Sequence, residues 1–292
     1  MTDKEISGKT QICALIGDPV EHSMSPAMHN AAYQALGLDY VYIPFRVKAR
    51  ELEQAVRGLR ALNVRGFNVT MPHKVTIIPL LNSLDPLAEK IGAVNTVVND
   101  GGDLKGYNTD GEGFLRALRE KGMEPDEKNI VLLGAGGASR AISYVLAQQG
   151  ARLAILNRRL ELAWAEDIAR LILEDLDIEV EVMELGAGQL AGALEDADIL
   201  VNATSVGMSP ESSKSPVPAA LLKPGLTVFD IVYNPIETRL LREAKAAGAR
   251  VISGVDMLAW QGALAFEKWT GQAAPLGLMR REALKLLEAH ED

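Results

Sequence analysis

A glycine-rich segment near the middle of the chain has the residue types and spacing of a dinucleotide-binding turn. It reads GAGGAS over residues 134–139 and follows the apolar run IVLL at 130–133. In such a turn Gly134 permits a tight bend, and Gly136 lets the backbone approach a pyrophosphate at a helix N-terminus. The expected cofactor-binding residues are Gly134, Ala135, Gly136, Gly137 and Ala138. A glycine-rich turn without a nucleotide is the alternative, which the strand-turn-helix context disfavours.

The residues after the next predicted strand, 152–156, indicate which dinucleotide binds. NAD-binding folds usually place an aspartate or glutamate there, which accepts a hydrogen bond from the ribose 2′-hydroxyl. This chain has Asn157, Arg158 and Arg159 instead. Two guanidinium groups can make forked, charge-assisted bonds to the 2′-phosphate of NADP. We therefore expect NADP(H) as the cofactor, bound by these three residues. A solvated basic tip on the surface is the alternative.

Alternating strands and helices must position the residues in the first part of the chain. Strands are predicted at three short apolar runs, 11–17, 40–46 and 66–70. Ser25 followed by Pro26 predicts the N-cap and the first position of a helix between the first two strands. A second helix is expected over 50–62, where leucine and valine recur on one face. A hydroxyl ahead of a proline at 70–74 predicts the opening of another helix.

A hairpin and a second alternating run follow. The turn at 99–102 separates strands predicted at 93–98 and 103–108. Further strands are predicted at 130–133, 152–156, 179–183, 199–203, 228–233 and 249–253. Because helical stretches separate these strands, they predict a second, parallel sheet. The last helices are expected over 257–270 and 276–290.

The pattern as a whole predicts an α/β fold of two domains. An N-terminal α/β substrate domain is expected over residues 1–112, completed by helices within 256–292 that return to it. A Rossmann dinucleotide-binding domain is expected over 113–255. A length of 292 residues suits two domains that each bury a core of their own.

Composition and charge limit the classes of partner that the protein is expected to bind and the cellular compartment in which it is expected to occur. The formal net charge is −9 and the basic residues are scattered, so neither nucleic acid nor an anionic membrane is expected as a partner. The single cysteine, Cys13, excludes an intrachain disulfide and suits a reducing compartment. The first residues lack a signal-peptide pattern, and no apolar run approaches the roughly 18 residues of a transmembrane helix. We expect a cytoplasmic protein that binds a small molecule, as a monomer or homodimer.

A set of motifs, in order along nearly the whole chain, resembles the shikimate dehydrogenase family. These motifs are GDPVEHSMSPAMHN, GFNVTMPHK, GAVNTVV, GYNTDGEGF, LLGAGGASRA, NATSVGM, VYNP and WQGALAFEKWTG. The resemblance implies an oxidoreductase that reduces 3-dehydroshikimate reversibly to shikimate with NADPH. It implies a place in aromatic amino-acid biosynthesis, on the route to chorismate.

The resemblance implies that Lys74 and Asp110 are the catalytic residues, beside the reacting oxygen. Reduction of a ketone needs a proton donor or a cation where the alkoxide charge develops, and a lysine can serve as either. An aspartate can hold the ammonium group and accept a hydrogen bond from a ring hydroxyl. A catalytically silent NADP-binding sensor is the alternative, and it would need neither residue.

The resemblance also implies a set of substrate-binding residues. Ser23 and Ser25 resemble a hydroxyl pair that grips the substrate carboxylate, with the ring of Tyr233 closing over the same end. The ring hydroxyls are expected to be bound by Asn68, Thr70, Asn95 and Gln261. Oriented polar groups of this kind reject an analogue that lacks the matching hydroxyl. The structural alternatives are helix capping for Ser25, bracing of strand ends for the asparagines, and core packing for Tyr233.

The motifs NATSVGM and VYNP contain two further cofactor-binding candidates, Thr204 and Val232. Gly254 and Met257 complete the set, with Met257 expected as an apolar wall near the nicotinamide and core packing as its alternative. The segment SPESSKSPVP, residues 209–218, follows a predicted strand and is a candidate lid over the cofactor. His22, His29 and His73 match no metal-ligand spacing, so no metal is expected, and surface or packing roles are favoured for them.

A second enzymatic interpretation stays open from the sequence. The arginine pair also resembles family members that accept quinate, and such a dual-specificity enzyme would use NAD or NADP. Members with NAD activity tend to carry an acidic residue just beyond the pair, where this chain has Leu160. Pocket space near Ser23, Ser25 and Tyr233 would decide whether quinate fits.

Overall fold

The chain divides into two compact units in a computed structural model that describes residues 6–291. Unit 1 comprises the described residues up to Thr109 together with Ala259–Ala289, and unit 2 runs from Asp110 to Leu258. The sequence pattern placed these junctions at residues 112 and 256. The chain therefore leaves unit 1, builds unit 2, and returns to unit 1 through its last helices.

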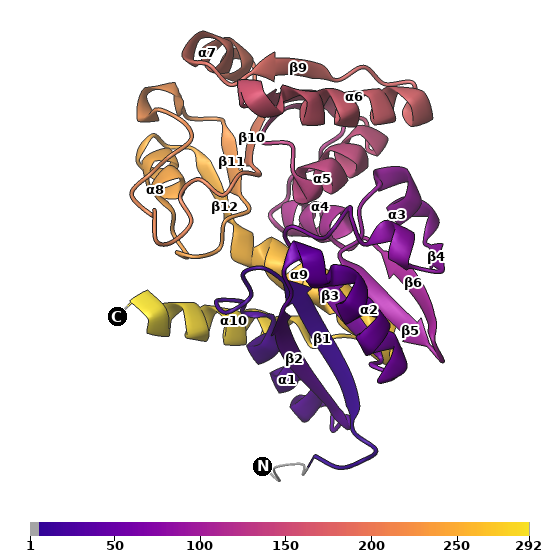
Figure 1. Cartoon of the computed structure of the whole chain (residues 1–292). Helices are drawn as coiled ribbons and strands as arrows, with labels where there is room; N and C mark the ends of the chain where they lie inside the picture. The colour runs from indigo at the N-terminus through magenta and orange to yellow at the C-terminus, as the bar shows by residue number, and fades with distance from the viewer. Residues whose placement is uncertain (1–5, 292) are drawn as a thin grey trace. The chain divides into compact units, whose positions relative to one another are not determined.

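Unit 1 is built on a six-stranded mixed sheet in the order β2-β1-β3-β5-β6-β4. Its strands are β1 (Gln11–Gly17), β2 (Tyr40–Arg46), β3 (Gly66–Val69), β4 (Ser83–Leu84), β5 (Thr96–Asp100) and β6 (Asp103–Tyr107). Strand β1 pairs in parallel with β2 and β3, whereas β5 is antiparallel to β3 and β6. The predicted βαβαβ run and the hairpin are confirmed, and the short β4 is an addition that the sequence pattern did not indicate (Figure 1).

Helices of unit 1 cover this sheet. They are α1 (Ser25–Ala35), α2 (Leu52–Ala61), α3 (Pro86–Ile91), most of α9 (Gly254–Thr270) and α10 (Leu276–Glu291). Helix α2 forms because its apolar residues share one face, and Leu52, Val56 and Leu59 pack in the core with Ile16 and Phe67 of the sheet. The helices predicted after Ser25, over 50–62, over 257–270 and over 276–290 are confirmed, and α3 was not predicted.

The prediction that Ser25 is an N-cap is wrong. Ser25 is the first residue of α1, and Met24 before it already has helical dihedrals, φ −80 and ψ −13. An N-cap residue needs an extended backbone to bring its side chain under the free N–H groups. Ser23, two residues upstream, supplies the polar contact instead, because its Oγ accepts a hydrogen bond from the Ser25 N–H at 3.3 Å.

Residues 70–74 do not open an α-helix, so that prediction is also wrong. Turns occupy 71–77, and a short 3₁₀ helix, Ile78–Leu80, follows. The four β-branched residues at 75–78 and the proline that follows Ile78 disfavour α-helix here. The segment is a shaped loop between β3 and β4, and Lys74 lies on this loop.

Unit 2 is built on a second six-stranded sheet in the order β12-β11-β10-β7-β8-β9, with every pairing parallel. Its strands are β7 (Asn129–Leu133), β8 (Arg152–Asn157), β9 (Glu181–Glu184), β10 (Ile199–Asn202), β11 (Thr227–Asp230) and β12 (Arg250–Ser253). In chain order within the unit, the sheet reads 3-2-1-4-5-6 from β9 to β12, which is the dinucleotide-binding order. The predicted parallel sheet is confirmed.

The helices of unit 2 are α4 (Asp110–Glu120), α5 (Gly137–Gln148), α6 (Leu162–Leu176), α7 (Ala187–Glu195) and α8 (Arg239–Ala246). The strand order reverses between β7 and β10, and ligands of such sheets bind at the carboxyl ends of the strands beside that reversal. The glycine-rich turn follows β7, and Thr204 follows β10. The topology therefore brings two predicted cofactor segments to one edge of the sheet.

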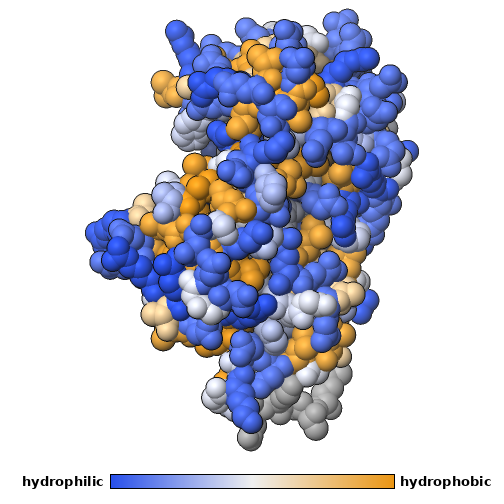
Figure 2. Space-filling model, turned by 90° about the vertical axis from the view of Figure 1, so that its right-hand side faces the viewer, coloured by the Kyte–Doolittle hydropathy of each residue, from blue (hydrophilic) through white to orange (hydrophobic). Residues whose placement is uncertain are grey.

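Ten large apolar side chains are exposed among the described residues. Hydrophilic residues cover much of the face in Figure 2, with hydrophobic residues in several patches between them. Leu160 and Trp164, which follow the predicted arginine pair in the sequence, are 99% and 53% exposed. Within residues 6–291, no helix combines the length and apolar character needed to cross a bilayer.

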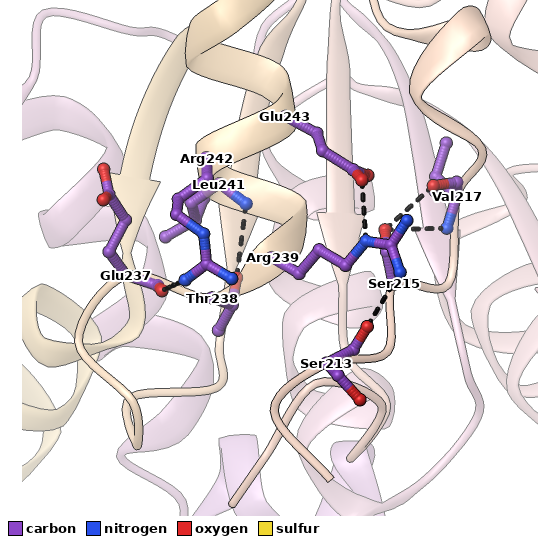
Figure 3. A network of polar contacts seen from close by, with 9 residues as sticks. All are labelled: Ser213, Ser215, Val217, Glu237, Thr238, Arg239, Leu241, Arg242 and Glu243. Atoms are coloured by element: carbon purple, nitrogen blue, oxygen red, sulfur yellow. Dashed lines mark hydrogen bonds and ion pairs between the residues drawn. The ribbon is translucent and has the colours of Figure 1, made fainter. Parts of the chain in front are cut away.

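The candidate lid at 209–218 is fastened to its own unit by polar contacts. Arg239 at the start of α8 donates from Nη1 to the Ser213 carbonyl oxygen at 2.9 Å and pairs through Nε with Glu243 at 2.7 Å (Figure 3). The Ser209 N–H donates to the Asn234 carbonyl oxygen at 2.9 Å, and Ser215 Oγ donates to the Val217 carbonyl oxygen at 2.8 Å. The loop has a defined path along α8.

Candidate active site

The glycine-rich turn of unit 2 has the geometry that its sequence predicts. Gly134 has φ +96, a conformation that favours glycine, and a Cβ there would lie 2.9 Å from Thr204 Cγ2. Ser139 stands where the common motif has its third glycine. Its buried Oγ donates to the Gly134 carbonyl oxygen at 2.6 Å, so the serine holds the turn closed.

The N-terminus of α5 fits a pyrophosphate group. Gly136 is the N-cap with an extended backbone, and within the described chain no side chain caps the helix and no acidic residue lies in its first turn. Its N–H groups and the positive end of its dipole are thus directed at any bound anion. A Cβ on Gly136 would meet no described atom within 4 Å, which leaves space for phosphate oxygens against the backbone.

The predicted 2′-phosphate residues differ in their partners. Arg158 is exposed and makes a forked ion pair with Glu161, with Nη2 2.7 Å from both carboxylate oxygens. Arg159 is exposed and makes no ion pair with another described residue. Asn157 is buried, and its Nδ2 donates to the Glu161 carbonyl oxygen at 2.6 Å, so its amide shapes this turn. The sequence interpretation missed Glu161 as a competitor for Arg158.

A buried carboxylate supports two more predicted cofactor positions. Asp230 is fully buried and accepts hydrogen bonds from Asn202 Nδ2 at 2.9 Å, the Val232 N–H at 3.0 Å and Thr238 Oγ1 at 2.6 Å. Asn202 Oδ1 in turn accepts from Thr204, at 3.1 Å from its N–H and 2.7 Å from its Oγ1. Burial raises the pKa of Asp230 to about 6, although the three donors oppose that rise. Asp230 joins the loops of Thr204 and Val232.

The last cofactor candidates lie where α9 begins. Gly254 is its first residue, and a Cβ there would lie 2.4 Å from the Ile231 carbonyl oxygen, so only glycine fits. Met257 is buried in the next turn. Tyr233 is half-buried in the loop after β11, and desolvation raises the pKa of its hydroxyl. Tyr233 and Asp110, the first residue of α4, both belong to unit 2.

Unit 1 gathers three of the predicted ring-binding residues into one hydrogen-bond network. Asn68 on β3 donates from Nδ2 to Thr96 Oγ1 at 3.0 Å, and Thr96 Oγ1 donates to Asn95 Oδ1 at 3.0 Å. Asn95 Nδ2 lies 2.9 Å from Thr109 Oγ1 and 3.5 Å from Gln261 Oε1. The asparagines and threonines of this network are buried, and Gln261 is half-buried. Thr96 and Thr109, which connect the predicted residues, were missed, although both lie inside the quoted motifs.

The remaining unit 1 candidates lie on loops at the carboxyl ends of β1 and β3. Ser23 is half-buried between β1 and α1, and Ser25 is buried at the start of α1. Thr70 follows β3, and its N–H donates to the Ile16 carbonyl oxygen at 2.9 Å. Because β1 and β3 are adjacent parallel strands, their carboxyl ends carry these hydroxyl groups at one edge of the sheet.

A backbone hydrogen bond and the neighbouring His73 fix the position of the loop at Lys74. Its carbonyl oxygen accepts from the Val94 N–H at 2.7 Å, and its side chain is half-buried. His73 is buried, and its Nε2 lies 2.7 Å from the Val47 carbonyl oxygen, an acceptor, so Nε2 is the donor. His73 thus anchors the loop that carries Lys74, which bears out the packing role expected for it. No group of three potential metal ligands occurs among the described residues.

Comparison with known proteins identifies the family. Residues 15–97 match the shikimate dehydrogenase substrate binding domain, and residues 254–284 match the shikimate 5'-dehydrogenase C-terminal domain. A protein of Desulforamulus reducens named shikimate dehydrogenase (NADP(+)) is 50% identical over 278 residues, which cover 94% of this chain and 95% of that protein. The chain belongs to the shikimate dehydrogenase family.

Solved structures of this family agree with the fold over almost the whole chain. A shikimate dehydrogenase in complex with NADP+ superposes with a TM-score of 0.91 at 42% identity, over 97% of this chain and 98% of that chain. A shikimate 5-dehydrogenase from Listeria monocytogenes in complex with shikimate and NAD gives 0.88 at 42% identity, over 95% and 98%. The resemblance and the two-domain fold inferred from the motifs are confirmed.

Proposed function

We propose that this chain catalyses the reversible, NADP-dependent reduction of 3-dehydroshikimate to shikimate. The observation that carries the proposal is the 50% identity, over almost the whole length of both proteins, to a relative named shikimate dehydrogenase (NADP(+)). The two units supply what such a reaction needs. Unit 2 has a dinucleotide-binding turn, and unit 1 has a cluster of oriented polar groups suited to a small polyol acid.

We assign substrate binding to unit 1 and to Tyr233. The hydroxyls of Ser23 and Ser25 would donate to the substrate carboxylate, and Tyr233 would cover that end. The ring hydroxyls would be bound by Asn68, Thr70, Asn95 and Gln261. The network of the two asparagines supports this assignment, because groups fixed by hydrogen bonds discriminate strongly between ligands with and without a matching hydroxyl.

Lys74 is the proposed proton donor and Asp110 its proposed partner. During reduction Lys74 would give a proton to the carbonyl oxygen as negative charge develops there, and in the reverse direction it would take the proton back. Asp110 would orient the ammonium group and accept a hydrogen bond from a ring hydroxyl. The half-buried side chain of Lys74 supports this role, since a partly desolvated cation interacts more strongly with developing charge.

The NADP(H) site is assigned to unit 2. The backbone of 134–138 and the N-terminus of α5 would bind the pyrophosphate, and Asn157, Arg158 and Arg159 would surround the 2′-phosphate. Thr204, Val232, Gly254 and Met257 would line the remainder. When bound, NADPH supplies the hydride. These residues orient the cofactor and set its selectivity.

Absorbance of the reduced cofactor tests the proposal. Shikimate and quinate are crossed with NADP and NAD in a steady-state assay of the purified chain. Shikimate with NADP should exceed every other pair in kcat/KM by about 100-fold, the discrimination that a site built on specific polar contacts achieves. Comparable rates with quinate or NAD would assign the dual-specificity activity instead. Absence of turnover with every pair would contradict the proposal and favour a silent NADP-binding sensor.

We propose that the enzyme acts in the cytoplasm as a monomer or homodimer. The single buried Cys13 supports a reducing compartment. Sedimentation at several concentrations measures the assembly state, and a stable higher oligomer would contradict this part of the proposal.

A further inference from the structure

One buried hydroxyl, that of Tyr42, contacts two of the proposed substrate-binding residues. Tyr42 lies in β2, is 2% exposed, and donates from its hydroxyl to Asn68 Oδ1 at 2.7 Å. The side chain of Ser25 hydrogen-bonds the same hydroxyl. Ser25 begins α1 and Asn68 belongs to β3, so the Tyr42 hydroxyl connects residues from two different elements.

The position of Tyr42 is fixed from its backbone to its ring. Its N–H donates to Asn30 Oδ1 at 2.8 Å, and its carbonyl oxygen accepts from Asn30 Nδ2 at 3.0 Å. Its ring stacks on the His29 imidazole, with centroids 4.5 Å apart and planes inclined by 7°. Trp269 packs beside both rings, at 5.9 Å from Tyr42 and 5.2 Å from His29. A side chain held at both ends can act as a rigid spacer.

The donor and acceptor roles in this cluster follow from the number of hydrogens that each polar group carries. The two N–H groups of Asn68 Nδ2 are donated to the Asn95 carbonyl oxygen at 3.1 Å and to Thr96 Oγ1 at 3.0 Å. Asn68 therefore presents only its Oδ1 as an acceptor, which takes the single proton of Tyr42. Since Tyr42 cannot also donate to Ser25, the Tyr42 oxygen is the acceptor of that pair. The single Ser25 proton would therefore turn from Tyr42 to the carboxylate when substrate binds, while Tyr42 keeps its bond to Asn68.

We propose that Tyr42 is a positioning residue for substrate binding, whose hydroxyl fixes the spacing of Ser25 and Asn68. The inference rests on the proposed function and adds to it a residue that does not itself touch the substrate. A rigid ring that carries a carboxylate and hydroxyls needs both ends of its site at a constant separation. Tyr42 maintains that separation from behind the site.

Tyr42→Phe tests this inference because it removes the hydroxyl and keeps the ring. The KM for shikimate should rise about 10- to 100-fold, the cost of leaving buried partners without a hydrogen bond, while kcat changes much less. The Kd of NADP+, measured by calorimetry without substrate, should stay within about twofold, because its proposed residues lie in unit 2.

Tyr33→Phe is the matched control. Tyr33 is 1% exposed in the same aromatic cluster, and its hydroxyl lies beside the Cys13 thiol, outside the network of Asn68. This variant should retain the wild-type KM for shikimate within about threefold. Equal KM values for Tyr42→Phe and Tyr33→Phe would overturn the inference. A wild-type chain without shikimate turnover would instead contradict the proposed function itself.

Two double-mutant comparisons test the same coupling, one with Tyr42 intact and one with Tyr42 replaced. If Tyr42 connects the two residues, the losses in kcat/KM caused by Ser25→Ala and Asn68→Ala should be non-additive, by about threefold or more. In the Asn68→Ala background, Tyr42→Phe should cost little more. Additive losses in both comparisons would show that Tyr42 acts on neither residue, and they would overturn the inference.

Discussion

In unit 1 the proposed ligand-binding groups are side chains that are buried and hydrogen-bonded to one another, whereas in unit 2 they are mainly backbone N–H groups and exposed guanidinium groups. Asn68 and Asn95 are 5% and 2% exposed, but the Arg158 side chain is 74% exposed. The difference follows from the ligands. A small polyol is recognised by the direction of each hydrogen bond, while phosphates are recognised by charge and by close approach to glycine.

The comparison extends to the buried titratable groups. Unit 1 buries His29 without a hydrogen-bond partner among the described residues, and desolvation lowers its pKa to about 3. Unit 2 buries Asp230, whose pKa is raised to about 6. Burial favours the neutral form of both groups, but one is a base and the other an acid. The two units should therefore respond to pH in opposite directions.

The largest effect should come from Lys74 and should be confined to catalysis. Lys74→Met removes the proposed proton donor, so kcat should fall about 100- to 10,000-fold, the usual contribution of a positioned acid. The Kd of NADP+ should not change, because the dinucleotide turn lies in the other unit. Lys48→Met, at an exposed lysine of the same unit, is the control and should retain wild-type kcat. Unchanged turnover in Lys74→Met would refute the assigned role.

Opposite pH responses form the second prediction. The folded-state pKa of Asp230 lies above its ordinary value of 3.8, so its contribution to stability is complete below about pH 4 and is lost as pH rises through about 6. The loss amounts to about 3 kcal/mol. The pKa of His29 is lowered from 6.5, so its contribution is present above that pH and decreases as pH falls toward about 3.

Urea unfolding from pH 4 to pH 8 measures both responses. Relative to wild type, Asp230→Asn should gain in free energy of unfolding as pH rises from 4 to 7, and His29→Phe should gain as pH falls below 6.5. Stability differences that stay constant across this range would show that neither group titrates differently in the folded protein.

The smallest expected effects are on NADP+ binding, to which Arg158 and Arg159 should contribute unequally. Arg159→Ala should weaken NADP+ binding about 10-fold and leave NAD+ binding within about twofold, because only NADP+ carries the 2′-phosphate. Arg158→Ala should weaken NADP+ binding less, since Glu161 already holds that guanidinium group. Glu161→Gln, which frees Arg158, should strengthen NADP+ binding. Calorimetry without substrate measures all three, and equal losses for both dinucleotides in Arg159→Ala would contradict the assignment.

The sequence predicted most elements because their apolar spacing is regular. The runs at 11–17 and 40–46 coincide with β1 and β2, and both are short, mostly apolar runs. The helix expected at 70–74 failed because a proline after a hydroxyl also occurs in turns, and local chemistry alone does not separate the two. Strand β4 is only two residues long, Ser83–Leu84, and too short to leave a pattern.

The sequence predicted which residues belong to the candidate site, but it did not predict the hydrogen bonds that connect them. The motifs identified Asn68, Asn95 and Ser25 one at a time. They could not reveal that Tyr42 and Thr96 link them, because hydrogen bonds between residues up to 28 positions apart depend on strand register. The ion pair of Arg158 with Glu161 is local, three residues apart, and helical spacing could have predicted it.

The two hydrogen bonds between the Asn30 side chain and the backbone of Tyr42 also affect whether strand β2 can pair with a strand of another molecule. Strand β2 is at the edge of its sheet, where unpaired N–H and C=O groups can recruit a strand from another molecule. At Tyr42 the Asn30 side chain occupies both of these groups. Asn30 thus takes the place that an intruding strand would need at this position of the edge.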